Sequence, residues 1–81
     1  MSDHHLLDRI TVNPKIMVGK PTIKGTRLTV QFILGLLAQG ATNADILKDY
    51  PGLTEDDIRA CLLFARNSIE NISFIPLTEK V

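Results

Sequence analysis

The sequence predicts a small α+β domain, mostly α-helical, in which a short β-arm precedes a body of three helices. Between residues 30 and 70, three stretches carry helical spacing of apolar residues, and each follows a threonine that can cap a helix. The first 29 residues instead combine short alternating runs with glycine and proline, as strands and turns do. At 81 residues the chain is one domain. We divide it into a β-arm (1–29), a three-helix body (30–70) and an apolar tail (71–81).

Composition excludes several classes of protein. The sequence is 44% hydrophobic and 22% charged with no net charge, which is an ordinary globular mixture. No apolar run reaches the roughly 18–20 residues of a membrane span, and the N-terminus lacks the basic and apolar regions of a signal peptide. The single cysteine, Cys61, cannot form an internal disulfide and suits a reducing compartment. We expect a cytoplasmic protein.

The β-arm contains three candidate strands. Ile10 and Val12 alternate with polar residues over 8–12, which predicts a short, half-buried strand. Thr22–Lys24 and Arg27–Leu28 are two further candidates, and Gly25 relaxes the backbone between them. The brief apolar run Ile16–Val18 ends at Gly19. Strands this short need a partner strand or a helix.

The first helix is expected between Thr29 as N-cap and Gly40 as the residue that follows its C-cap. Its apolar residues cover an arc of roughly 240°, against a usual width of about 100–140°. Either the whole domain folds around this helix or part of its surface meets a second chain. We predict a homodimer in which an edge near Phe32 and Leu36 is closed by the arm or tail of a second subunit, with Phe74 contributing from the tail.

The second and third helices have similar start signals. Thr42 followed by Asp45 is close to a capping box and predicts a helix of about two turns, with Ile46, Leu47 and Tyr50 facing inward. Pro51-Gly52 stops it. Thr54 followed by Glu55, Asp56 and Asp57 starts the third and longest helix, with carboxylates where the helix dipole favours them. A short turn between two such helices gives the outline of a helix-turn-helix.

Periodicity divides the third helix into two faces. One face is expected to be buried and carries Ile58, Cys61, Leu62, Ala65, Ile69 and Ile72. The other is expected to be exposed and carries Arg59, Leu63, Arg66, Asn67 and Glu70. Leu63, between arginines, is a candidate interface contact, although a lone exposed leucine is normal.

Charge is unevenly spread along the chain. Residues 1–29 carry a formal charge of +3 and residues 30–70 a charge of −3. Lys20, Lys24 and Arg27 are therefore candidates to contact DNA phosphates or an acidic protein partner; the structural alternative is a solvated hairpin. The loop lacks the spacing of a nucleotide-binding P-loop.

A DNA-binding helix-turn-helix normally inserts the start of its second helix into the major groove. In this sequence that start is acidic and would repel phosphates. DNA would have to be met by Arg59 and Arg66 further along the helix, or by the arm.

Catalytic and metal sites have little support. His4 and His5 are adjacent near the N-terminus with no cysteine or carboxylate cluster close by, so we expect surface residues and no metal. Cys61 lies on the apolar face of its helix and is expected to be a small core residue. No nucleophile–histidine set is evident, so we expect neither an enzyme nor a cofactor.

Two segments carry a family resemblance. Arg9-Ile-Thr-Val-Asn-Pro-Lys-Ile-Met-Val-Gly-Lys-Pro-Thr-Ile-Lys-Gly-Thr-Arg27 and Ile46-Leu-Lys-Asp-Tyr-Pro-Gly-Leu-Thr-Glu-Asp-Asp-Ile58 together closely resemble a bacterial domain of unknown function, number four hundred thirty-three, over roughly residues 7–66. The resemblance implies a homeodomain-like helix-turn-helix and an antitoxin-like partner of a small PIN-type nuclease. The leading expectation is thus an antitoxin-like regulator that binds its operator and a nuclease toxin. The alternative is a helix-turn-helix-shaped interaction module that does not bind DNA.

Overall fold

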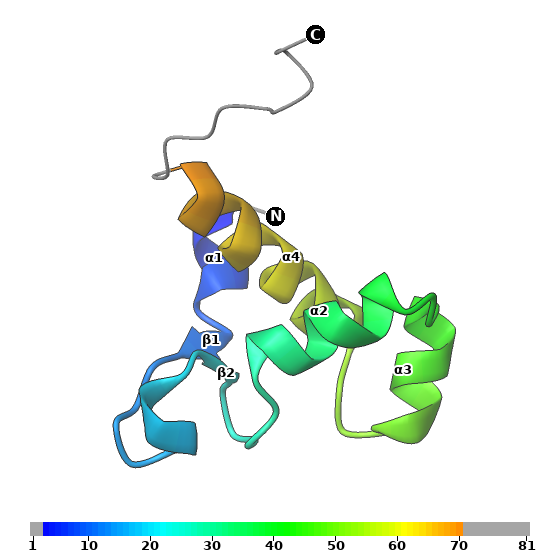
Figure 1. Ribbon diagram of the computed structural model, residues 1–81, viewed down its shortest axis with the longest axis horizontal. Coiled ribbons are helices and arrows are strands. Elements are labelled where there is room, and N and C mark those ends of the chain that lie inside the picture. Colours follow the sequence, from blue (N-terminus) through cyan, green and yellow to red (C-terminus); the bar gives the residue numbers. More distant parts are fainter. Residues whose placement is uncertain (1–2, 71–81) are drawn as a thin grey trace, which may run out of the picture.

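Helix α2 (Val30–Ala38) lies at the centre of the computed structural model, which describes residues 3–70 of the chain (Figure 1). Around it are α1 (Asp3–Leu7), β1 (Ile10–Thr11), the 3₁₀ turn η1 (Met17–Gly19), β2 (Thr22–Ile23), α3 (Asn43–Asp49) and α4 (Glu55–Glu70). The predicted class, α+β and mostly helical, is confirmed. None of the helices described is long and apolar enough to cross a bilayer. The expected packing of the tail and of Ile72 lies outside the described residues.

Both predicted ends of α2 are confirmed. The Thr29 hydroxyl accepts a hydrogen bond from the backbone N–H of Phe32 at 3.0 Å, which satisfies one of the donors left free in the first turn. Gly40 has a φ of +103°, and its N–H donates to the carbonyl of Leu37 at 3.0 Å. A side chain at position 40 would strain this left-handed backbone, so glycine ends the helix here.

The helix-turn-helix pair consists of α3 and α4. At the start of α3, the Asp45 N–H donates to the Thr42 hydroxyl at 3.1 Å and the Thr42 N–H donates to the Asp45 carboxylate at 3.0 Å. This is the predicted capping box. The hydrogen bonds from Thr42, from its backbone first and its side chain second, hold the pKa of Asp45 below its ordinary value because they favour the ionised carboxylate.

The core draws on the arm as well as on the three-helix body. Its buried members are Ile23 from β2, Val30 and Ile33 from α2, Ile46 from α3, Leu53 from the turn, and Ile58 and Cys61 from α4. Ile33, Ile46 and Ile58 are the largest of the fully buried aliphatic side chains. Each contributes about 1.5–3 kcal/mol by leaving water. The domain therefore folds around α2, and the arm supplies part of its cover.

The arm holds one two-stranded antiparallel sheet. Ile10 of β1 lies opposite Ile23 of β2, so the strand that the alternating pattern predicts is present and β2 is its partner. The strand ends earlier than expected, however, and Val12 is 58% exposed rather than buried. The predicted strand at Arg27–Leu28 is wrong: the chain turns back at Gly25, and the N–H of Ile23 donates to the Leu28 carbonyl at 2.9 Å within a tight turn.

The apolar run before Gly19 is an exposed turn. Met17 and Val18 have φ values of 50° and 56°, in the left-handed region that β-branched side chains rarely adopt. The Val18 side chain is 92% exposed. Backbone hydrogen bonds from Gly19 to Ile16 and from Lys20 to Met17, both 3.1 Å, close the turn.

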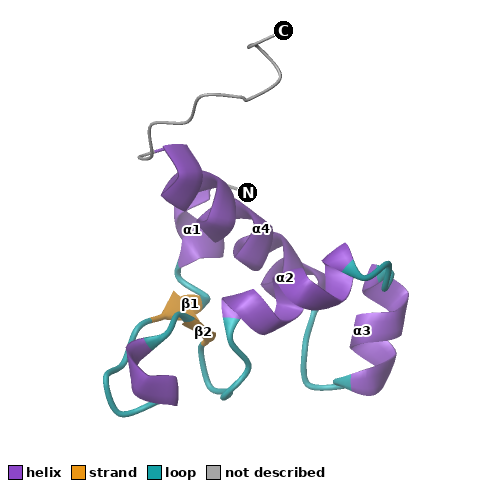
Figure 2. Cartoon of the chain, in the orientation of Figure 1, coloured by secondary structure: helices purple, strands orange, loops and turns teal. Residues whose placement is uncertain are grey.

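The buried face of α4 is rotated from the predicted one. Leu62 and Ile69 are 49% and 61% exposed, whereas Ala60 is completely buried and Leu63 is half-buried. A helix that the sequence analysis did not predict, α1, packs along α4 (Figure 2). Leu63, which periodicity assigns to solvent, is half-buried in the structure.

We expect the Cys61 thiol to be unreactive in the native protein. Burial, reinforced by the negative charge of Asp57, raises its pKa to about 12 from an ordinary value of 9.0. Because the thiolate is the nucleophile, at pH 8 its population is about a thousandfold lower than in the unfolded chain. The measurement is the rate of reaction with a disulfide reagent in buffer and in urea, and comparable rates would contradict the buried assignment.

Candidate functional site

The start of α4 is the most densely hydrogen-bonded polar region of the described chain. The Asp57 N–H donates to the Thr54 hydroxyl at 3.2 Å, and the Thr54 N–H donates to the Asp57 carboxylate at 2.9 Å. This reciprocal pair has the geometry of a capping box. Asp57 is only 8% exposed, so the carboxylate that caps the helix is also a buried charge.

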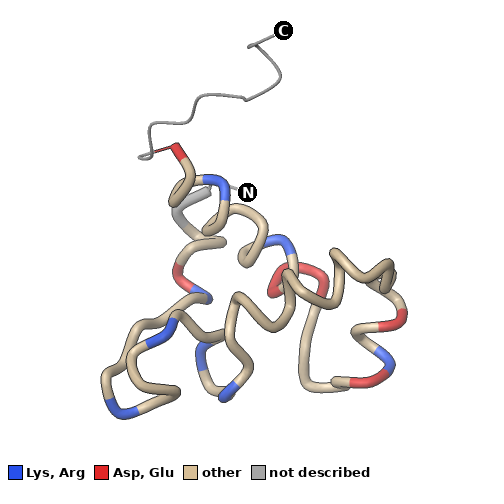
Figure 3. The backbone as a smooth tube through the Cα atoms, viewed as in Figure 1, with Lys and Arg blue, Asp and Glu red and all other residues tan. Residues whose placement is uncertain are grey.

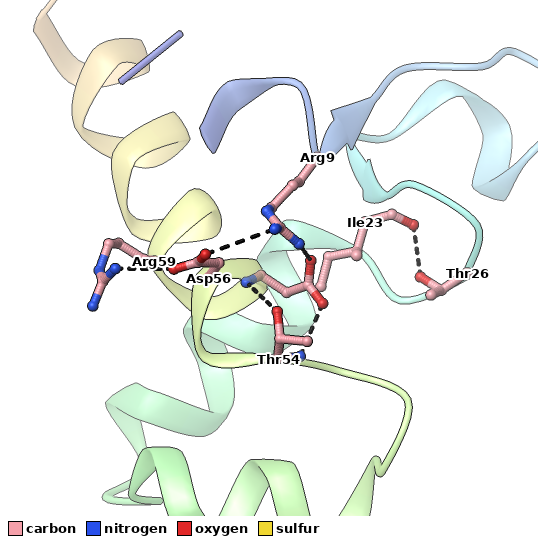
Figure 4. Close-up of polar contacts among 7 residues, drawn as sticks. Arg9, Ile23, Thr26, Thr54, Asp56 and Arg59 are labelled. Atoms are coloured by element: carbon pink, nitrogen blue, oxygen red, sulfur yellow. Dashed lines mark hydrogen bonds and ion pairs between the residues drawn. The ribbon is translucent and has the colours of Figure 1, made fainter. Parts of the chain in front are cut away.

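Arg9 supplies the opposite charge. Its guanidinium lies at the end of the loop between α1 and β1 and reaches the start of α4, as Figure 4 shows. One terminal nitrogen, Nη1, is 3.1 Å from Asp57 Oδ1, and the other, Nη2, is 3.7 Å from Asp56 Oδ2. A buried carboxylate is tolerated when it is both paired and hydrogen-bonded, and Asp57 meets both conditions.

This arrangement leaves little of the first turn of α4 for an external ligand. Asp57 is held by Thr54 and Arg9, and Asp56 is held by Arg9 and by Arg59 at 2.9 Å. The third acid, Glu55, accepts a hydrogen bond from the Asn43 side chain at 3.2 Å. The acids therefore cap and anchor the helix, and their charge opposes insertion of this end into a DNA groove.

The three candidate cations of the arm are exposed. Lys20, Lys24 and Arg27 form no ion pair with any other residue of the described chain. In Figure 3 the basic segments of the arm gather at one end of the molecule, while acidic segments lie along α3 and at the start of α4. The arm thus presents positive charge that the fold itself does not neutralise.

The two candidate cations of α4 differ from those of the arm. Arg59 pairs with Asp56 at 2.9 Å, and Arg66 pairs with Glu70 at 3.1 Å one turn further along the same helix. Both arginines are exposed, so these pairs are weak. They nevertheless place a negative charge beside each guanidinium, and any phosphate that approaches either arginine meets that charge as well.

The residues assigned to the dimer interface have different environments. Phe32 is 41% exposed, and its ring meets that of Tyr50 edge to face with centroids 5.7 Å apart. Leu36 is half-buried and packs against the core. Phe74 lies outside the described residues. The expected edge of α2 is therefore only partly covered within the described part of one chain, and Phe32 is its exposed member.

Histidines and carboxylates form no metal-binding group of three within the described residues. His5 belongs to α1, is exposed, and borders a polar hollow together with Asp8, Arg9, Lys24 and Asp57. The thiol of Cys61 is buried in the core.

Arg9 is the residue of this candidate site that the sequence analysis missed. It lies 48 positions from Asp57, and it was counted only as part of the charge of the arm. Two features of the sequence could have indicated this contact: an arginine beside the first apolar strand and three acids in the first turn of the third predicted helix. No pattern of nearby residues predicts that the arginine and the acids meet.

The fold and this site define a class: small α+β domains that join a basic β-arm to a helix-turn-helix whose second helix begins with capping and ion-paired acids. Residues 10–65 match the family described as a protein of unknown function (DUF433), and the chain belongs to this family. A crystal structure of a DUF433 member protein from Anabaena variabilis is similar, with 30% sequence identity and a TM-score of 0.74. The match covers 83% of this chain and 66% of that one, slightly less than two thirds of its length. No curated protein matches the sequence.

Replacing Arg9 should destabilise the domain. In Arg9→Met the aliphatic stem is kept but Asp57 loses its countercharge, and we expect a loss of about 1–2 kcal/mol in the free energy of unfolding. The value is below that of a fully buried pair because the Arg9 side chain is 37% exposed. Urea denaturation followed by circular dichroism measures this loss.

The matched control is Arg66→Met, whose exposed partner is within the same helix, and a change within about 0.5 kcal/mol is expected there. Equal losses in the two variants would contradict the anchoring role of Arg9.

Proposed function

We propose that this protein is a small, antitoxin-like DNA-binding regulator that acts as a cytoplasmic homodimer and contacts DNA through its basic arm. The observation that carries the proposal is the contrast among its cations. Lys20, Lys24 and Arg27 are exposed and have no ion-pair partner in the described chain, whereas Arg59 and Arg66 each have a carboxylate beside them. Cations without a partner can neutralise phosphates, and this neutralisation supplies much of the affinity for DNA.

In this proposal the arm contacts the phosphate backbone. Lys24 lies at the hairpin turn beside Gly25, and Arg27 lies on the opposite side of the same turn. Backbone contacts position a protein on the duplex but carry no sequence information of their own. Operator choice then requires further contacts. The acids at the start of α4 cap the helix and hold Arg9, and their negative charge argues that these contacts do not come from the usual insertion of that helix end.

The proposal extends to a protein partner, a PIN-type nuclease, through the family resemblance to antitoxin-like proteins. Co-purification with a small nuclease encoded in the neighbouring reading frame tests this part separately. A neighbouring frame that encodes no such nuclease would count against it.

A second candidate function is that of a protein-interaction module that keeps the helix-turn-helix shape without binding DNA. Two observations favour it. Arg9 and the capping hydrogen bonds occupy the acids of the helix end that usually reads DNA. Met17, Val18 and Phe32 are exposed apolar side chains, and Arg27 lies in the same depression as Met17 and Phe32. An apolar centre with an arginine is common in protein interfaces.

A pair of triple variants separates the two functions. With DNA from its own promoter, the wild-type protein should shift the duplex at low salt. The affinity of Lys20→Ala/Lys24→Ala/Arg27→Ala should be at least tenfold lower, and its dependence on log salt should fall by about three per chain. The matched control, Lys48→Ala/Arg59→Ala/Arg66→Ala, removes the same charge from exposed residues of the body and should retain most of the affinity. No shift by the dimeric wild type at low salt would refute DNA binding and leave the interaction module.

The dimer is tested by mass in solution. At micromolar concentration, light scattering should give the mass of two chains for the wild type and of one chain for Phe32→Glu, because a charge at this edge of α2 opposes burial against a second copy. Leu62→Glu, a similar change at a side chain that is 49% exposed on α4, should remain dimeric. A wild-type mass of one chain would refute the homodimer.

A further inference from the structure

An open apolar groove runs between α2 and the C-terminal half of α4. Its walls are Pro21, Val30 and Leu34 on one side and Phe64, Ala65 and Ile69 on the other, and its volume is about 330 Å³. This volume is at the lower end of ligand pockets in proteins. The groove lies on the edge of α2 opposite Phe32 and Leu36, because residues 30 and 34 lie on a different side of the helix from residues 32 and 36.

The chemistry of the groove suits an aliphatic or aromatic side chain and little else. Ile69 is 61% exposed on one wall, and the half-buried side chains of Leu34, Phe64 and Ala65 lie deeper. The Ser68 hydroxyl also borders the groove but donates to the Phe64 carbonyl at 2.9 Å, so its hydrogen already has a partner. No charged side chain of the described residues lines this groove. Exposed apolar surface of this kind marks a contact site.

We propose that the groove is filled by the C-terminal tail of the same chain, through the apolar segment Phe74-Ile75-Pro76-Leu77. Helix α4 ends at Glu70, immediately after the groove residue Ile69, and eleven further residues follow. The first of them is Asn71, and asparagine is one of the few residues other than glycine that favour the left-handed conformation by which a chain turns away from a helix end.

The lengths agree. The groove extends back along α4 from Ile69 to Phe64, which is about 7.5 Å at 1.5 Å per residue. The segment 74–77 spans about 10 Å when extended, and residues 71–73 are enough to reverse the chain. A segment tethered this closely has an effective concentration on the order of millimolar, which exceeds that of a second copy at micromolar protein. The tail of the same chain is therefore favoured over the tail of a second copy as the occupant of the groove.

Tail docking gives the two edges of α2 separate roles. The tail covers the edge at Val30 and Leu34 from within the chain, and the edge at Phe32 remains for a second subunit. Phe74, which the sequence analysis assigned to the dimer interface, then belongs to the groove of its own chain. The inference does not depend on DNA binding.

A tryptophan reporter tests the proposal, because the chain contains no tryptophan. In full-length Phe74→Trp, we expect blue-shifted emission and at least threefold protection from acrylamide quenching, relative to a Thr78→Trp reporter beyond the docked segment. Adding Ile69→Glu, on the groove wall, should remove both effects. Adding Leu62→Glu should remove neither, although it is an equally apolar-to-acidic change at an exposed position of the same helix.

Dilution distinguishes a tail that docks on its own chain from a tail that is supplied by a second copy. Emission that stays constant from about 0.1 to 100 μM protein supports docking within one chain. Emission that shifts to the red on dilution would mean that a second copy supplies the tail and would overturn the proposal. Emission of the Phe74→Trp variant that matches that of free tryptophan, or that Ile69→Glu leaves unchanged, would also overturn it. Circular dichroism of each variant confirms that the helices are retained.

Discussion

The contact on which the arrangement of the domain depends is the ion pair between Arg9 and Asp57. It joins a residue near the N-terminus to the start of the longest described helix, at a point where Asp57 is buried and also caps that helix. One carboxylate therefore fixes a helix start and the position of the arm at the same time. The arm in turn brings Ile23 into the core and covers part of α2. The β-arm is thus a structural part of the domain as well as its basic surface.

The same contact decides how charge is distributed on the outside. Arg9 and Arg59 form ion pairs with Asp56 and Asp57, so two of the acids in the first turn of α4 have cationic partners within the domain. The cations of the arm have no such partners in the described chain. A polyanion approaching the arm meets positive charge that folding has left available, and one approaching α4 meets paired charge. This asymmetry is why the arm, and not the second helix of the pair, carries the proposed contact with DNA.

Local chemistry explains what the sequence predicted well. The caps at Thr29, Thr42 and Thr54 each depend on hydrogen bonds across three residues, which a sequence pattern contains in full. The errors on the helices come from contacts distant in sequence, whereas the wrong strand at Arg27–Leu28 comes from a local turn at Gly25. A five-residue helix such as α1 has too few turns to be stable alone, and only its packing on α4 maintains it. On the same helix α4, Leu62 is exposed and Leu63 half-buried, the reverse of the predicted faces. Of the candidate site, the cations of the arm were predicted, but the partners of Arg9 were not.

The turn at Met17 and Val18 shows that this family member is not optimised for stability at every position. A β-branched residue in a left-handed conformation costs roughly 1–2 kcal/mol, and Val18 recovers almost none of this through packing because its side chain is 92% exposed. Glycine at position 18 would adopt the same backbone without that cost. A domain of 81 residues has little stability to spare. Valine at this tip therefore carries a backbone cost that its packing within the described residues does not offset.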